Sequence, residues 1–291
     1  MKKRKIIWVL LILLLADLTY SFFQYSNEPL DGDIAPIVLP APHYAPVFDD
    51  PFGFEVISGG EKYGGTNRFS VHFLMSYYFK TVPIALQAFF EPIESVYYAC
   101  GFFKLFVHVS ILVLLAVYIR IVLKSSGIQV SDTFEVSDTS TLIFISVLLT
   151  PLFNATEYTL YMGVINPSVT YTFFYPFPLI FLMIFFLPFY KKMMKDESEN
   201  LTVETVGWAD FLTHGFNRGT AAKHLILIFL LIGLAFSGVL VAPIVLIICP
   251  MILSFLFWKN LNQHSEQKSG FYAFSKIPKT FLFYFSIFII L

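Results

Sequence analysis

The chain has 291 residues, of which 57% are hydrophobic and only 13% are charged, and its mean hydropathy is +0.71. Soluble domains usually carry about a quarter charged residues, and here the apolar residues come in long blocks, which is typical of a polytopic membrane protein. The net charge of −1 argues against a nucleic acid as a partner. We therefore expect an all-α integral membrane protein whose partners include membrane lipids.

Seven apolar segments are predicted to cross the membrane. In chain order they are residues 6–23, 101–123, 142–153, 171–190, 224–240, 241–258 and a last segment that begins near residue 281. The first follows a basic stretch, as in a signal peptide, but no small-residue cleavage site follows it, so we expect an uncleaved helix. The last stops after only about 11 apolar residues, too few for a span unless the preceding SKIPKT is included in it. We therefore expect residues 1–291 to be one transmembrane domain, and the N-terminal part of a longer protein.

Basic residues indicate the orientation of these segments. Lysines and arginines gather before the first segment, after the second and fourth, and between the sixth and seventh. These places share one side of the membrane if the segments alternate, so the positive-inside rule predicts a cytoplasmic N-terminus. Residues 24–100 then form a large external loop and residues 191–223 a cytoplasmic loop. We expect the membrane to be the inner membrane of a bacterial cell.

The predicted external loop has the composition of a folded surface. Its first part, DGDIAPIVLPAPHYAP, is punctuated by prolines and is predicted to be extended, and SGGEKYGGTNR is rich in turn-forming residues. Residues 69–79, FSVHFLMSYYF, are apolar and rich in tyrosine but too short to span. They predict an interfacial helix, which Lys80 and Pro83 interrupt.

Two acidic pairs stand in the first half of this loop. Asp31 and Asp33 form an Asp-x-Asp motif soon after the first apolar segment, and Asp49 and Asp50 follow in DDPFGF. The plain interpretation of each pair is a solvated turn, since Asp-Gly and the residues around a proline are common in turns. A carboxylate can also take a proton from an acceptor hydroxyl, and two carboxylates can hold a divalent metal ion. The spacing at Asp31 and Asp33 permits both roles.

The order of these features resembles the beginning of a GT-C glycosyltransferase. It comprises a first helix that starts in the cytoplasm, an acidic motif after it, a large external loop with an interfacial helix, and a second span. The resemblance rests on DGD (Asp31, Asp33) and on DDPFGFEVISGGEKY (Asp49, Asp50), and it covers roughly residues 1–125. It implies a membrane enzyme that moves a sugar from a polyprenyl-phosphate-linked donor to an acceptor on the external face. One of the four aspartates would then be catalytic.

The leaving phosphate of such a donor needs a counter-charge or hydrogen-bond donors. The substrate-binding candidates are Arg68, His72, Lys104 and His108. Arginine suits bidentate phosphate contact, and Lys104 and His108 are four residues apart, hence on one helical face. The alternatives are that Arg68 meets lipid headgroups, that Lys104 extends to water, and that His72 is structural. Glu157, between the third and fourth segments, is a further acidic candidate.

Two other classes of function stay open, a transporter or flippase of a lipid-linked glycan and a non-catalytic membrane scaffold. Transporters usually show paired repeats and interrupted helices near the midplane. The sequence has no internal repeat, and its acidic residues gather in a loop rather than in the apolar segments, which favours the enzyme. It also lacks the phosphate-binding, zinc-protease and serine-hydrolase motifs and any Cys/His cluster.

Overall fold

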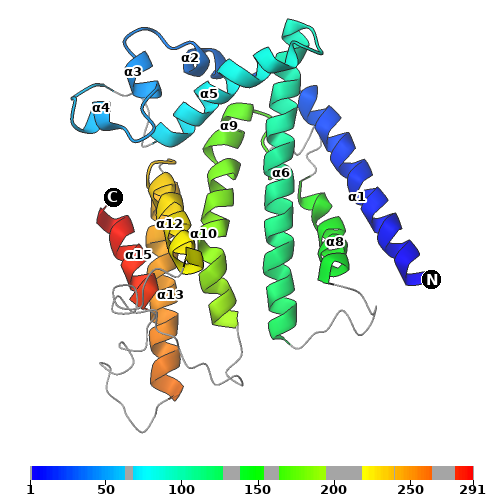
Figure 1. Cartoon of the computed structure of the whole chain (residues 1–291), viewed down its shortest axis with the longest axis vertical. Helices are drawn as coiled ribbons and strands as arrows, with labels where there is room; N and C mark the ends of the chain where they lie inside the picture. Colours follow the sequence, from blue (N-terminus) through cyan, green and yellow to red (C-terminus); the bar gives the residue numbers. More distant parts are fainter. Residues whose placement is uncertain are drawn as a thin grey trace. The chain divides into compact units, whose positions relative to one another are not determined.

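The computed structural model describes residues 2–62, 68–126, 138–153, 164–194, 218–238, 240–263 and 279–290. Every regular element among these residues is a helix, which confirms the all-α class (Figure 1). The chain forms two compact units, Met1–Lys195 and Asp196–Leu291. That they belong to one transmembrane domain stays a prediction.

Each of the seven predicted segments coincides with or overlaps helical structure. The helices are α1 (Lys2–Ser26), α6 (Pro92–Ser125), α8 (Asp138–Leu149) followed by a 3-10 turn η1 (Thr150–Leu152), α9 (Val169–Phe174) with α10 (Pro176–Met194), α12 (Arg218–Ala235), α13 (Val241–Gln263) and α15 (Lys279–Ile290). Among the described residues, the stretches long and apolar enough to cross a membrane are Ile6–Ser26, Pro92–Ser125, Val169–Lys191 and Val241–Trp258. These four mark an integral membrane protein.

The helix α6 begins nine residues before the predicted span, at Pro92 rather than at residue 101. Proline is favoured in the first turn of a helix, and Glu94 in the same turn suits the positive end of the helix dipole. These capping signals lie in a polar stretch, so the apolar run alone did not reveal them. The helix has 34 residues and contacts α1, α5, α8 and α10.

The predicted interfacial helix is longer than expected. Helix α5 (Phe69–Leu86) runs through Lys80 and Pro83, so the predicted interruption is wrong. Pro83 lies in the last turns, where it removes one backbone donor, and the Thr81 hydroxyl donates to the Tyr77 carbonyl 2.7 Å away. Figure 1 shows α5 lying across the end of α6 at which that helix begins, whereas α1, α8 and α10 run along α6.

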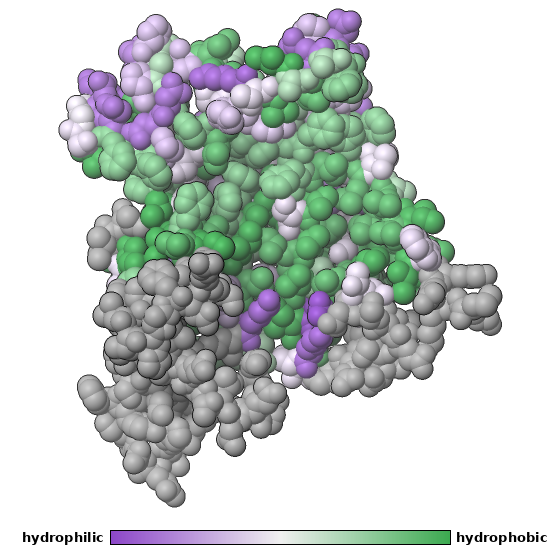
Figure 2. Space-filling model, viewed as in Figure 1, coloured by the Kyte–Doolittle hydropathy of each residue, from purple (hydrophilic) through white to green (hydrophobic). Residues whose placement is uncertain are grey.

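The proline-rich segment is predicted to be extended, and this prediction is wrong for part of it. It contains the short helices α2 (Ile34–Val38) and α3 (Ala45–Phe48), and α4 (Phe54–Ile57) follows. Pro36 and Pro46 fall in the first turns of α2 and α3, where a missing N–H leaves no helical bond unmade. Hydrophilic side chains gather over this part, and apolar ones cover the flanks of the neighbouring long helices (Figure 2).

The core of the first unit joins α1, α5, α6 and α9. Phe103 of α6 stacks on Phe173 of α9 with ring centroids 3.5 Å apart, and Met75 and Val107 are fully buried. The helices α1 and α6 approach closely at Gly101. A Cβ atom at this position would lie 2.0 Å from the Ser26 Oγ atom, which leaves no room for a side chain. In the second unit α12 packs against α13 and α15.

Candidate functional site

The carboxylate of Asp31 is bound to the start of α9. Its oxygens accept hydrogen bonds from the Ser168 hydroxyl at 2.9 Å, the Thr170 hydroxyl at 2.6 Å and the Thr170 amide at 3.1 Å. The Asp33 amide donates to the same carboxylate at 3.2 Å. Asp31 therefore connects the segment that follows α1 to α9, a helix more than a hundred residues further along the chain.

A buried ion pair lies beside this contact. The Lys104 ammonium, on α6 and only 1% exposed, donates to the Glu28 carboxylate and to the Pro167 carbonyl. Pro167 is followed by Ser168, the N-cap of α9, so Lys104 and Asp31 hold the same short segment. The predicted alternative, in which Lys104 extends to water, is wrong because the side chain is enclosed.

We call Glu28, Asp31, Asp33, Lys104 and Thr170 the carboxylate cluster. Burial raises the pKa of Glu28, and the neighbouring Lys104 only partly opposes this. For Asp31 burial also acts to raise the pKa, but the hydrogen bonds from Thr170, Ser168 and the Asp33 amide outweigh it. The pKa of Asp31 therefore lies below the ordinary value, and this carboxylate is a fixed anion at neutral pH.

Asp33 is the exposed member of the cluster. It stands at the N-cap of α2, and its side chain makes no capping hydrogen bond to that helix. The Asp33 backbone amide donates a hydrogen bond to the Asp31 carboxylate, which fixes the Asp33 backbone. The Asp33 carboxylate is itself exposed to solvent. The two aspartates of the Asp-x-Asp motif thus differ, because one is saturated with donors and the other is accessible.

His108 lies one turn further along α6 from Lys104 and is fully buried. Its Nδ1 atom lies 3.1 Å from the Tyr25 hydroxyl, and its ring stacks on Phe153 at 4.1 Å. Among the described residues, the buried side-chain atoms with no hydrogen-bond partner are its Nε2 atom, the Oδ2 atom of Asp17 and the Oγ atom of Ser76. Asp17 is in α1, so the expectation that acidic residues avoid the apolar segments is wrong at this position.

Arg68 and His72 stand at the other end of α9. The Arg68 guanidinium donates to the Tyr175 hydroxyl at 3.2 Å and lies 4.4 Å from the centre of the Phe174 ring. His72, buried between the edges of Phe48 and Phe174, has its pKa lowered to about 4 by burial and by the charge of Arg68. Arg68 is therefore a partly exposed cation that lies on an aromatic surface.

Asp49 and Asp50 have local partners. Asp49 forms an exposed ion pair with Lys80 at 3.6 Å. The Asp50 carboxylate accepts hydrogen bonds from the Phe52 amide at 3.1 Å and the Glu55 amide at 2.8 Å, which shapes the turn before α4. Their predicted catalytic role is untested, but these contacts match the plain turn interpretation.

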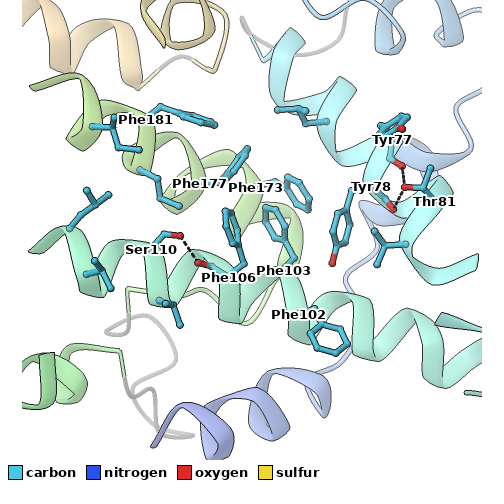
Figure 3. Close-up of a pocket in the computed structure, with 17 residues that line it drawn as sticks. Tyr77, Tyr78, Thr81, Phe102, Phe103, Phe106, Ser110, Phe173, Phe177 and Phe181 are labelled. Carbon is cyan, nitrogen blue, oxygen red and sulfur yellow. Dashed lines mark hydrogen bonds between the residues drawn. The ribbon is translucent and has the colours of Figure 1, made fainter. Parts of the chain in front are cut away.

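A cavity of about 960 Å³ opens between α5, α6 and the α9–α10 region (Figure 3). Its walls are apolar and aromatic, and none of the described residues that line it is charged. Three of its hydroxyl groups donate within the protein, Tyr78 to the Ala99 carbonyl, Thr81 to the Tyr77 carbonyl and Ser110 to the Phe106 carbonyl. On α6 the lining residues Phe102, Phe106 and Val113 lie opposite the face that carries Lys104.

The structure therefore divides the predicted site residues into groups. Asp31, Asp33 and Lys104 come together, and His108 follows on the same face of α6. The separate groups are Arg68 with His72 and Asp49 with Asp50, while Glu157 lies outside the described residues.

Three residues of this site, Glu28, Ser168 and Thr170, are not among those predicted from the sequence. One signal for the last two was available, because Ser168 and Thr170 stand in NPSVT before an apolar run, a pattern typical of a helix N-cap. No comparable signal identified Glu28.

A divalent metal ion at Asp31 and Asp33 stays an untested prediction. Oxygen ligands suit such an ion, but the Asp31 oxygens here already accept four hydrogen bonds, which a metal would have to displace. Within the described ranges no group of three or more His, Cys, Asp or Glu is arranged to hold a metal.

Comparisons of the chain with protein families, with curated proteins and with solved structures find no match.

Proposed function

We propose that the protein is an integral membrane glycosyltransferase of the GT-C type. It moves a sugar from a polyprenyl-phosphate-linked donor to an acceptor on the external face of a bacterial inner membrane. About seven segments cross the membrane, the N-terminus is cytoplasmic and residues 24–100 are external. The observation that carries this proposal is the carboxylate cluster at the end of the first membrane helix, where a saturated Asp31 holds an exposed Asp33.

Asp33 is the general base in this proposal. A base must reach the acceptor hydroxyl, and Asp33 is exposed whereas Asp31 has its oxygens occupied by four donors. The acceptor oxygen bonds to the sugar carbon as the bond from that carbon to the phosphate oxygen breaks. The acceptor proton passes to Asp33, and the phosphate leaves as an anion with its lipid.

Arg68 is the cation that meets the phosphate. Lys104 is neutralised by Glu28 and enclosed, and His108 is buried within α6, so neither is available at the surface. The Arg68 guanidinium is partly exposed and is oriented by Tyr175 and Phe174. A preorganised guanidinium suits the charge that develops on a leaving phosphate.

The apolar cavity supports a lipid-linked donor. It lies between α5 and two stretches of membrane-spanning length, α6 and Val169–Lys191, and its uncharged lining favours a hydrocarbon chain. Phe173 lines this cavity, and the next residue, Phe174, lies under Arg68. A chain in the cavity and a phosphate at Arg68 would therefore occupy neighbouring positions along α9.

Transfer from radiolabelled polyprenyl-phosphate hexoses, by the chain purified in lipid nanodiscs, tests the proposal. Asp33→Asn should lower turnover by roughly 10²–10⁴-fold, as expected for loss of a general base. Asp50→Asn is the matched control and should retain turnover. Full activity of Asp33→Asn would move the base to another aspartate, and full activity of all four single Asp→Asn variants would end the catalytic proposal.

One observation favours a transporter or flippase instead. Asp17 and His108 place ionisable side chains inside membrane helices, and such residues often mark a transport pathway. The same labelled lipid, tested with the protein reconstituted in sealed vesicles instead of nanodiscs, distinguishes the two functions. Protein-dependent movement of the labelled lipid across the bilayer without sugar transfer, lost in Asp17→Asn, would support the transporter.

A further inference from the structure

We infer that α9 is a bridge that fixes the carboxylate cluster relative to Arg68, and that Thr170 is the positioning residue at its first turn. The inference rests on the proposed function for its meaning in catalysis. Its structural content stands on the contacts at the two ends of α9.

The first end of α9 is held from two directions. Asp31 binds the Thr170 amide, the Thr170 hydroxyl and the Ser168 hydroxyl, and Lys104 binds the carbonyl of Pro167. Thr170 is fully buried, so its hydroxyl bond to Asp31 is shielded from water. Hydrogen bonds to a charged group are the stronger kind, and several converge on this carboxylate.

The second end of α9 contacts Arg68. Phe174 is the last helical residue and lies under the guanidinium, and Tyr175, directly after it, accepts the Arg68 hydrogen bond. Phe174 is also buried against His72 of α5, the helix that Arg68 directly precedes. The proposed phosphate-binding cation is therefore attached to the end of the helix whose start carries the aspartates.

The length and limits of α9 suit a spacer. The six residues of α9 rise by about 9 Å, so the contacts at its two ends are held about one and a half turns apart. The helix ends before Pro176, because a residue that precedes proline is driven out of the α region, and Tyr175 has φ −124 and ψ −66. The break makes α9 a separate element from α10, with its own contacts at both ends.

Thr170→Val tests the inference, because valine keeps the shape and removes the hydroxyl. The matched control is Thr172→Val, since Thr172 is equally buried on the same helix but donates to the Asn166 and Ser168 carbonyls. Thr170→Ser retains the hydroxyl and should behave as the unmodified chain. Asp31→Asn removes the anion at the other side of the contact and serves if Thr170→Val does not fold.

The readout that does not depend on activity is amide hydrogen exchange of the chain in nanodiscs. We expect Thr170→Val to speed exchange roughly tenfold in peptides covering residues 28–33, with a smaller rise in peptides covering residues 68–72. Thr172→Val should leave both peptides unchanged. No change in residues 28–33, an equal change in both variants, or a change confined to residues 28–33 would overturn the bridge.

The readout for catalysis is the transfer assay. Thr170→Val should lower kcat by about tenfold with little change in KM, and Thr170→Ser should restore it. Absence of transfer in the unmodified chain would count against the proposed function only, because the exchange experiment still decides whether α9 is a bridge. Normal kcat in Thr170→Val, with exchange altered as expected, would overturn the role of Thr170 as a positioning residue.

Discussion

The two acidic pairs of the segment after α1 look alike in sequence and differ in what they bind. Asp31 accepts hydrogen bonds from residues 137 and 139 positions away, on α9. Asp50 accepts hydrogen bonds from residues two and five positions away, in its own turn. A carboxylate bound to a distant helix fixes the tertiary arrangement of a site, whereas one bound locally shapes a loop.

The lysines near the two pairs show the same difference. Lys104 and Glu28 have side chains 2% and 17% exposed, and Lys80 and Asp49 have side chains 43% and 64% exposed. Exposed ion pairs contribute little because water screens them, whereas removing one partner of a buried pair leaves an uncompensated charge. We therefore expect the same Lys→Met substitution to lower the free energy of unfolding far more at Lys104 than at Lys80.

Lys104→Met should have the largest effect. It leaves the Glu28 carboxylate partly buried without its cation, and we expect the free energy of unfolding to fall by roughly 3–5 kcal/mol. Thermal unfolding in detergent measures this, with Lys80→Met as the control, for which roughly 0–1 kcal/mol is expected. Adding Glu28→Gln to Lys104→Met should recover most of the loss. Equal effects of the two lysine variants would break the comparison.

Asp31→Asn should have an intermediate effect that depends on pH. Because the pKa of Asp31 is lowered in the folded protein, its ionised form stabilises the fold above the ordinary aspartate pKa of 3.8. That stabilisation disappears as the pH falls through the lowered value. At pH 7 the substitution should cost about 1.5–3 kcal/mol, from loss of hydrogen bonds to a charged group. Unfolding temperatures of the two proteins should converge on acidification, and a constant difference down to pH 3 would contradict the assignment.

Asp50→Asn should have the smallest effect. An asparagine can still accept from the Phe52 or the Glu55 amide, and helix-start caps of this kind are worth about 0.5–2 kcal/mol when removed outright. We expect a loss below about 1 kcal/mol. Circular dichroism during thermal unfolding would reveal it. A loss as large as that of Asp31→Asn would show that the two pairs are equivalent.

The helices were largely predictable from the sequence, because apolar runs report burial in a membrane directly. The ends of the helices were not predictable in the same way. Helix α5 continues past Pro83, and α6 begins at Pro92, before its apolar run. The site was predictable in part. Asp31 and Asp33 are conspicuous after the first helix, but their roles depend on which donors the fold brings near.

Pairing across long separations explains what sequence reasoning missed. Glu28 and Lys104 are 76 residues apart, and Asp31 and Thr170 are 139 apart. No periodicity or spacing links such positions, so an enclosed Lys104 cannot be distinguished from one that extends to water. The N-cap signal at Ser168 predicts the start of a helix, but not the carboxylate that binds it.

The length of α6 has a consequence for the membrane around the protein. The helix is about 51 Å long, well over the ~30 Å of a hydrocarbon layer, and the rise from Lys104 to Lys124 is about 30 Å, equal to that thickness. In the proposed orientation Lys104 thus marks the external boundary of the hydrocarbon. A thicker bilayer would submerge Glu28 and Asp31, and a thinner one would hydrate them. Lipid chain length would then set the hydration of the cluster as directly as a substitution within it.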